Sequence, residues 1–205
     1  MLELIKGASF DGADRLKEEY DVTDNAVYAN VNAGKIRAVF EAFLDGAADG
    51  EPLFMFIEAP CSIDEEVTIS CGEPVEKYHR NVYYLDGIRR SELLAFLKSG
   101  AGDILINDGL SSFGIGSFKT HVEIGKYKYN VMTGYPNGGD LSFLTGIFDG
   151  LGIPREKRIT TAWELFSDGC PGESRKYSVG GQDVYTVISG LEQFGMYKAE
   201  TREEK

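Results

Sequence analysis

The fold class depends most on residues 111 to 133, which read SSFGIGSFKTHVEIGKYKYNVMT. Apolar and polar residues alternate along this stretch, as they do in strands with one covered face. Before Gly125 the apolar Ile124 is at an even position, and after it Tyr127 and Tyr129 are at odd ones, where they should share a face. One strand cannot make this change without turning its core face outward, so we expect a bulge or turn near Gly125. The stretch therefore predicts an antiparallel β-meander.

Shorter strands are predicted on both sides of the meander. The longest apolar run, Leu53 to Ile57, lies between Pro52 and Pro60 and predicts a strand buried on both faces. Residues 67–71, 82–85 and 104–106 are predicted as further strands, and residues 177–188 as a hairpin that turns at Gly180 and Gly181. The charged end of the chain, from Lys198 to Lys205, is expected to fray.

Helices are predicted where apolar residues recur three and four positions apart. The most regular case is residues 35–47, with Asn32 before it and Gly46 near its end. Further helices are expected over residues 11–20, 91–98 and 141–151, and in a short segment that begins with the capping-box residues Thr161 and Glu164. Apolar residues surround the segment 141–151, so that helix is expected to be deeply buried.

The order of these elements predicts the class of the fold. Helices and strands follow one another without a regular β-α-β alternation, which favours an α+β fold over a parallel α/β fold. With 205 residues, no internal repeat and no long linker, the chain is expected to form a single globular domain over residues 1–205. We therefore predict a mixed or mainly antiparallel sheet packed against several helices.

The formal net charge of −12 narrows the range of partners. A surface this negative repels phosphate groups, so the sequence predicts neither nucleic-acid binding nor membrane binding. Cys61, Cys71 and Cys170 form no Cys-x-x-Cys pair, which suits a reducing cytoplasm. No basic and apolar leader is evident, and no segment approaches the roughly 20 apolar residues of a membrane span. A soluble cytoplasmic protein is therefore expected.

A candidate pocket is predicted around the glycine-rich part of the meander. Its residues are Asp108, Gly114, Gly116, His121 and Glu123. Carboxylates and imidazoles transfer protons in catalysis, and His121 and Glu123 are two residues apart, which places them on one face of a strand. The alternative interpretation is structural, because Asn-Asp-Gly is a favoured turn sequence and glycines let neighbouring groups approach closely.

Other kinds of chemistry have weaker support. The segment from Gly114 to Lys119 lacks the endings of known phosphate-binding loops. Cys61, Cys71, His79 and His121 lack the close spacing of zinc ligands. A thiol enzyme would need Cys61 beside a histidine, and His121 is the better candidate for that base. We therefore expect no cofactor and no metal.

Three functions are compatible with these features. We favour a protein-binding or inhibitor module that docks a basic partner, since the chain is acidic and carries no recognisable catalytic motif. Bacterial immunity proteins, which neutralise basic toxins, have this general size and charge, and the analogy extends no further. The second function is an enzyme of unrecognised type with its site in residues 108–123. The third is a small-molecule sensor that uses the same pocket. The sequence predicts neither the partner nor the oligomeric state.

Overall fold

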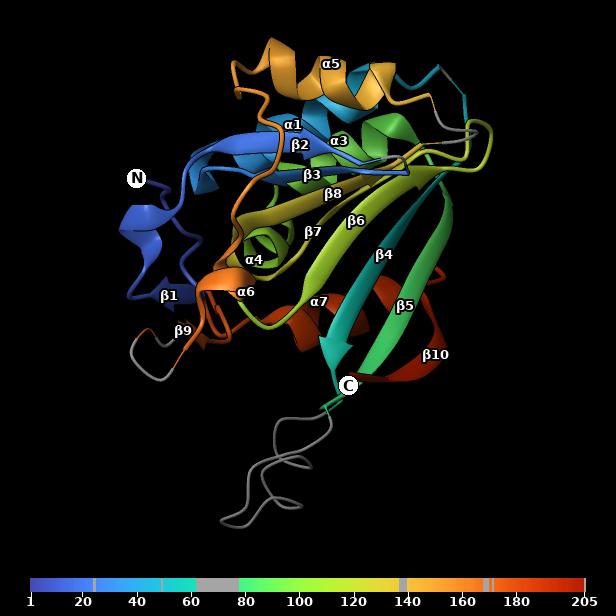
Figure 1. Cartoon of the computed structure of the whole chain (residues 1–205). Coiled ribbons are helices and arrows are strands. Elements are labelled where there is room, and N and C mark those ends of the chain that lie inside the picture. Colours follow the sequence, from blue (N-terminus) through green and yellow to red (C-terminus); the bar gives the residue numbers. More distant parts are fainter. Residues whose placement is uncertain are drawn as a thin grey trace.

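An antiparallel sheet of eight strands forms the centre of the protein (Figure 1). The computed structural model describes residues 1–23, 25–48, 50–61, 78–136, 140–167, 170 and 172–204. The strand order is β10-β5-β4-β6-β7-β8-β3-β2. In chain order, the strands of this sheet are β2 (Glu19–Val22), β3 (Val27–Asn30), β4 (Leu53–Pro60), β5 (Tyr78–Ile88), β6 (Ser112–Ser117), β7 (Glu123–Lys126), β8 (Val131–Tyr135) and β10 (Tyr197–Glu204). The predicted α+β class is confirmed, and β6, β7 and β8 form the predicted meander.

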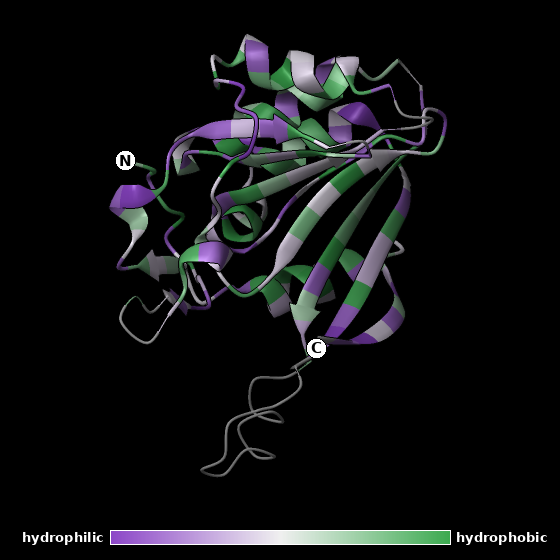
Figure 2. Cartoon of the chain, viewed as in Figure 1, coloured by the Kyte–Doolittle hydropathy of each residue, from purple (hydrophilic) through white to green (hydrophobic). Residues whose placement is uncertain are grey.

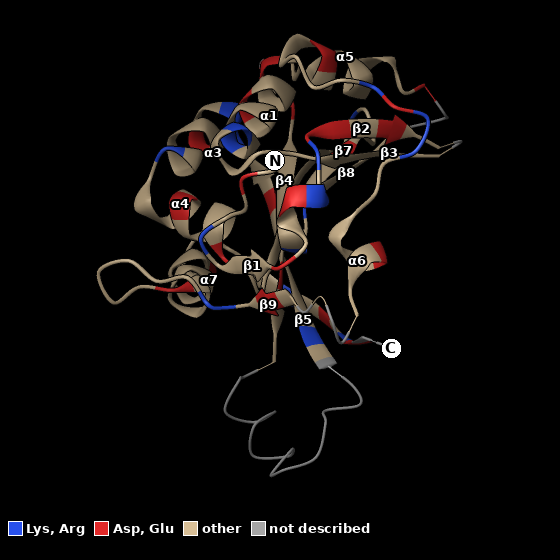
Figure 3. Ribbon diagram, turned by 60° about the vertical axis from the view of Figure 1, so that its left-hand side comes forward, with Lys and Arg blue, Asp and Glu red and all other residues tan. Residues whose placement is uncertain are grey.

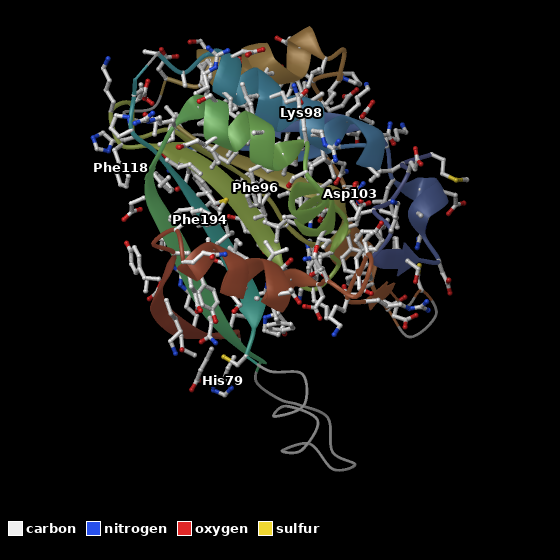
Figure 4. The ribbon with its side chains drawn as sticks, turned by 180° about the vertical axis from the view of Figure 1, so that it is seen from behind. His79, Phe96, Lys98, Asp103, Phe118 and Phe194 are labelled. Atoms are coloured by element: carbon white, nitrogen blue, oxygen red, sulfur yellow. The ribbon has the colours of Figure 1, made fainter. Side chains whose placement is uncertain are left out.

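Helices cover one side of the sheet. They are α1 (Ala33–Asp45), α3 (Arg90–Leu97), α4 (Gly100–Asn107) and α7 (Val184–Glu192), which lie behind the sheet in Figure 1 and in front of it in Figure 4. The helix α5 (Ser142–Gly150) packs on α1 at the top of Figure 1. The chain therefore has a helical layer on one face of the sheet, with α5 outside that layer.

The hydrophobic core lies between the helices and the sheet. Leu53, Met55 and Ile57 of β4 point into it and are fully buried, while the alternate residues point to the other side. From α1, Ile36, Val39, Phe40, Phe43 and Leu44 cover these positions, as the helical spacing predicted. Figure 2 shows apolar residues in green along β4 and on the helices behind it.

A second, smaller cluster closes one end of the sheet. The strands β1 (Ala8–Phe10) and β9 (Gly172–Ser174) pair with each other there, next to the short helix α6 (Ala162–Leu165). Two 3-10 turns, η1 (Ala13–Arg15) and η2 (Lys128–Asn130), complete the chain. The buried residues of this cluster are Leu2, Phe10, Leu16, Tyr129, Ala162 and Cys170.

Two predicted strands are helices in the structure. Residues 104–106 lie in α4, where Ser99 Oγ accepts a hydrogen bond from the main-chain N–H of Gly102 at 3.3 Å. Residues 184–188 lie in α7, where Asp183 accepts from the N–H of Thr186 at 3.0 Å. A short apolar run has no periodicity that separates a strand from a buried helix, and here the capping side chains decide.

Three other local predictions were also wrong. Residues 11–20 are not a helix, because they form η1 and the start of β2. The charged end does not fray but forms β10, an edge strand paired with β5. The helix α5 buries Leu144, Ile147 and Phe148 while Phe143 is 38% exposed, so it is not deeply buried all round. The strand predicted at 67–71 lies outside the described residues.

A turn, one of the two features expected near Gly125, makes the change of face. Gly125 itself continues β7, and the turn begins three residues later, in η2. Tyr129 and Asn130 have positive φ angles of 56° and 63° there. Tyr127 and Tyr129 therefore do not share a face: Tyr129 is buried in the second cluster, whereas Tyr127 lies over Gly125 of the sheet.

Candidate functional site

The sheet has one covered side and one open side. Among the described residues, no helix or strand lies in front of β4, β5 and β6 on the side turned away from the helices (Figure 1). We call this surface the open face. It is formed by Phe54, Phe56, Glu58, Tyr84, Asp86, Gly114, Gly116, Glu123, Gly125, Tyr127, Tyr135, Tyr197, Glu200 and Arg202.

The other half of this side, over β2 and β3, is covered by the segment that follows α5. Asn30 Nδ2 donates to the carbonyl oxygen of Thr160 at 2.9 Å. The N–H of Ile159 donates to Asp21 Oδ2 at 3.0 Å. The same segment also pairs with the outer edge of β2, where the N–H of Tyr20 donates to the carbonyl oxygen of Pro154 at 2.9 Å. This cover leaves the half of the sheet around β4 as the accessible one.

Glycines allow two aromatic rings to lie against the middle of the open face. A Cβ atom on Gly116 would be 2.2 Å from Phe54 Cζ, and one on Gly114 would be 2.1 Å from Phe56 Cε1. Any side chain at these two positions would displace the rings, so the glycines serve close packing. This is the structural alternative raised above for Gly114 and Gly116.

The aromatic residues of the open face form a continuous row. Ring centroids are 5.0 Å apart for Phe118 and Phe54, 6.0 Å for Phe54 and Tyr84, and 6.4 Å for Tyr84 and Tyr197. The row begins at Phe118, which follows the end of β6 and is 44% exposed (Figure 4), and it ends at Tyr197, which is 48% exposed. Large aromatic side chains that are accessible in this way are typical of protein interfaces.

Carboxylates surround this row, and Arg202 is the accessible cation among the described residues of the open face. Arg202 Nη1 donates to Glu58 Oε1 at 2.9 Å, and its Nε donates to Glu200 Oε1 at 2.6 Å. Tyr197 donates its hydroxyl hydrogen to Asp86 Oδ2 at 2.9 Å. Arg80 is buried and donates to the carbonyl oxygens of Glu58 and Leu110, so it adds little positive charge to the surface. The open face is therefore acidic as well as aromatic.

Glu123 is the carboxylate of the open face without a partner of its own. Among the described residues, no hydrogen bond or ion pair to its carboxylate is recorded. Burial raises the pKa of Glu123, and the nearby charge of Glu58 raises it further. Burial also raises the pKa of Tyr84 and Tyr127, with Glu123 and Glu58 as secondary causes for both. These shifts show that the carboxylates and phenols of the open face act on one another as one electrostatic cluster.

The structure does not gather the predicted pocket residues into one site. Gly114, Gly116 and Glu123 lie on the open face, but Asp108 and His121 lie beyond opposite ends of β6. A six-residue strand spans about 20 Å, so these two side chains are too far apart to act on one molecule of modest size. His121 is exposed in the turn between β6 and β7, with a positive φ of 53°.

Asp108 has a structural role. Its side chain is completely buried, and it accepts hydrogen bonds from the N–H groups of Leu110, Ser111 and Tyr177 at 3.1, 2.8 and 2.8 Å. Those three donors leave the carboxylate little capacity for catalysis, and they join the end of α4 to the segment before α7. The turn interpretation of Asn107-Asp108-Gly109 is therefore the one that this geometry supports.

The cysteine and histidine residues are also arranged differently from the expected pair. Cys61 donates its N–H to the carbonyl oxygen of His79 at 2.8 Å, at the far end of β4 from His121. His79 Nε2 lies 3.7 Å from Glu203 Oε1, and both side chains are about half exposed. Cys71 lies outside the described residues. Within the described part of the chain, no group of three or more His, Cys, Asp or Glu side chains could hold a metal ion.

Charges on the helical side contrast with those on the open face. Both signs are interleaved along α1 and α3 (Figure 3). Carboxylates of α1 and α4 have cationic partners: Asp45 with Arg90 at 2.5 Å, Glu41 with Lys98 at 3.9 Å, and Asp103 with Arg37 at 3.4 Å. Lys98 and Asp103 are labelled on this side in Figure 4. The helical side is thus close to electrically balanced.

Sequence reasoning missed most of the open face. Glu58, Tyr84, Tyr197 and Arg202 come from three strands, and Arg202 belongs to the segment that was expected to fray. A signal did exist in β10, because Tyr197, Glu200 and Arg202 stand on one side once a bulge at Ala199 is allowed for.

No protein-family model matches the chain, and neither does a curated protein or a solved structure. Among the helices of the described residues, none has the length and apolar composition needed to cross a bilayer.

Proposed function

We propose that the protein is a binding module that docks a basic protein partner on its open face. The observation that carries the proposal is the difference in charge and aromatic content between the two sides of the molecule. The helical side pairs its carboxylates with Lys and Arg, whereas the open face combines an aromatic row with carboxylates that outnumber its cations.

Charge complementarity identifies the chemistry of the partner. Glu58, Asp86, Glu123 and Glu200 would attract Lys and Arg side chains, and an acidic surface of this kind speeds association with a basic protein. The aromatic row supplies the apolar area that makes a complex persist after the encounter. In an inhibitor of a basic protein, such as an immunity protein, carboxylates would likewise attract the partner and aromatic side chains would hold it.

The enzyme and sensor alternatives have less support. They required Asp108, His121 and Glu123 in one pocket, and the described residues place these side chains at different ends of β6. An acidic, aromatic and exposed sheet face suits docking better than catalysis, because catalysis in water-excluded sites depends on a concave pocket.

Matched charge variants test the proposal. The triple variant Glu58→Gln, Glu123→Gln and Glu200→Gln removes three negative charges from the open face. The control triple Glu41→Gln, Asp45→Asn and Glu92→Gln removes three from the helical side. Wild type and both variants are used to capture proteins from the cells that make the chain, and bound proteins are quantified by mass spectrometry.

The proposal predicts that a basic protein is captured by wild type and by the control triple. The open-face triple should associate with it roughly tenfold more slowly at low salt, with a weaker dependence on ionic strength. Capture that falls equally in both triples would show that only net charge matters. Captured proteins that are acidic would also contradict the proposal.

A further inference from the structure

A hollow on the helical side of the sheet has the features of a small-molecule site. It has a volume of about 410 Å³ and lies between the end of α1, the start of α5 and the turn after β6. Its walls include Phe43, Glu51, Ser117, Val122, Asp140 and Phe143. Ser117 pairs with Leu53 and so stands on the covered side of the sheet, which separates this hollow from the open face.

The hydrogen bonds around Glu51 hold both oxygens of its carboxylate. Ser117 Oγ accepts from the N–H groups of Lys119 and Thr120 at 3.1 and 3.0 Å. A hydroxyl has two acceptor positions and one hydrogen, so the hydrogen of Ser117 is donated to Glu51 Oε1. The other carboxylate oxygen accepts from the N–H of Ala48 at 3.0 Å. Both oxygens of Glu51 therefore accept hydrogen bonds from neutral donors.

This carboxyl group is buried, and among the described residues it has no cationic partner. Glu51 is only 7% exposed, and among the described residues no Lys, Arg or His side chain forms an ion pair with it. Buried charges in proteins are normally paired, because removing a carboxylate from water is costly. The two hydrogen bonds offset part of this cost, and a positive charge entering the hollow would offset the rest.

Two aromatic rings line the same hollow as this carboxylate. The rings of Phe43 and Phe143 have centroids 5.7 Å apart, and Phe143 lies over Gly46, where a Cβ atom would be 2.2 Å from Phe143 Cε2. The face of an aromatic ring attracts cations, and its area accommodates an apolar body. Asp140, which is exposed, adds a second negative charge at the wall of the hollow.

We propose that the hollow binds a small organic ammonium, with the charged nitrogen at Glu51 and an apolar body against Phe43 and Phe143. The site is independent of the proposed docking function, since none of these residues belongs to the open face. A carboxylate floor with aromatic walls discriminates a primary amine from the neutral molecule of the same shape, because only the amine compensates the buried charge.

Calorimetric titration with phenethylamine and hexylamine tests this site, with 2-phenylethanol as the uncharged match. We expect at least one amine to bind with a dissociation constant of roughly 1 mM or tighter, and the alcohol to bind at least about tenfold more weakly. Glu51→Gln should weaken amine binding on the order of tenfold or more, since it removes a charged acceptor. The control Glu41→Gln, which makes the same change of charge on α1, should leave binding unchanged.

A second variant keeps the test decisive if Glu51→Gln folds poorly in a thermal melt. Phe143→Ala removes a partly exposed ring and should weaken amine binding severalfold without loss of the fold. Three results would overturn the proposal: equal binding of amine and alcohol, amine binding that both variants leave intact, and absence of any binding by both amines at about 10 mM. None of these results bears on capture of a basic protein by the open face.

Discussion

The two sides of the central sheet differ in how far their side chains are buried, although both are formed by the same strands. On the helical side of β4, Leu53, Met55 and Ile57 are fully buried by helices. On the open face of the same strand, Phe54 and Glu58 are partly exposed, while Phe56 is 5% exposed. Among the described residues, Phe54, Phe56 and Glu58 contact side chains of the neighbouring strands. The first side is built to exclude water, and the second leaves aromatic and acidic groups accessible. The accessible aromatic and acidic groups of the open face contribute little to the core, so they are the candidates for function.

The largest expected effect separates adjacent residues of β4. Met55→Ala should lower the free energy of unfolding by about 2–5 kcal/mol, because it leaves a cavity in a fully buried core. Phe54→Ala should cost less, about 1–2 kcal/mol, since part of its ring already contacts water. Urea denaturation of both variants measures the difference. Equal losses would mean that the open face is as well covered as the core.

On the helical side, buried Lys126 should make the free energy of unfolding depend on pH. Its ammonium is completely buried and donates to the carbonyl oxygens of Leu105, Asp108 and Ser111 at 3.4, 2.6 and 3.1 Å. Burial lowers the pKa of Lys126 to about 8, against the opposing influence of Asp108, and Arg80 lowers it further.

The sign of the effect follows from proton binding. Below pH 8 both the folded and the unfolded chain hold this proton, but between pH 8 and 10.5 the unfolded chain holds it and the folded chain does not. The free energy of unfolding should therefore rise by about 3 kcal/mol across that window, relative to a Lys126→Met variant. The chemical shift of Lys126 Cε, followed by NMR, reports the pKa directly even if the variant does not fold. A midpoint near 10.5 would contradict the expected cost of burial.

Alanine substitutions at two glycines, one on the open face and one in α1, compare the packing of the two sides. Gly114→Ala should destabilise the protein by about 1–3 kcal/mol, because the new Cβ would be 2.1 Å from Phe56 Cε1 and 2.9 Å from the carbonyl oxygen of Ile124. Gly34→Ala, in α1, meets no atom within 4 Å and should stabilise the helix by about 0.5–1 kcal/mol. Thermal melts compare the pair. A neutral Gly114→Ala would mean that Phe56 does not rest on the sheet.

Substitution of Glu123 should change the free energy of unfolding least. The change should also have the opposite sign to that of a core substitution such as Met55→Ala. The raised pKa of Glu123 means that the folded chain holds a proton that the unfolded chain has already released, so stability falls as the pH rises through this window. Glu123→Gln should therefore be neutral or stabilising at pH 7, by less than about 1 kcal/mol because water screens a partly exposed group. A clear loss of stability in denaturation experiments would assign Glu123 a structural role instead.

The sequence predicted the helical side better than the open face. The spacing of Ile36, Val39 and Phe40 determines which face of α1 is buried, and the run from Leu53 to Ile57 determines the central strand. These are local patterns, so periodicity is sufficient to find them. Ile104 to Ile106 was misjudged because a short apolar run carries no period, and only the cap at Ser99 shows that it belongs to a helix.

The open face is not a local pattern. Tyr84, Glu123 and Arg202 are brought together by the strand order, which a single sequence does not reveal. Glu123 was predicted as a site residue, but its neighbour Glu58 was not, because the two are separated by β6 in the sheet and by 65 positions in the chain, 123 minus 58. Asp108 and His121 were predicted as its companions from closeness in sequence, and the geometry places them elsewhere.

Carboxylate footprinting is the measurement that tests the central claim most directly. The chain is labelled with a carbodiimide and an amine nucleophile, alone and in complex with the basic protein that it captures, and the labelled positions are read by mass spectrometry. The account predicts that Glu123 and Glu200 of the open face lose label in the complex, while Asp45 and Glu92 of the helical side keep theirs. Loss of label at Asp45 and Glu92, with Glu123 and Glu200 still labelled, would contradict it.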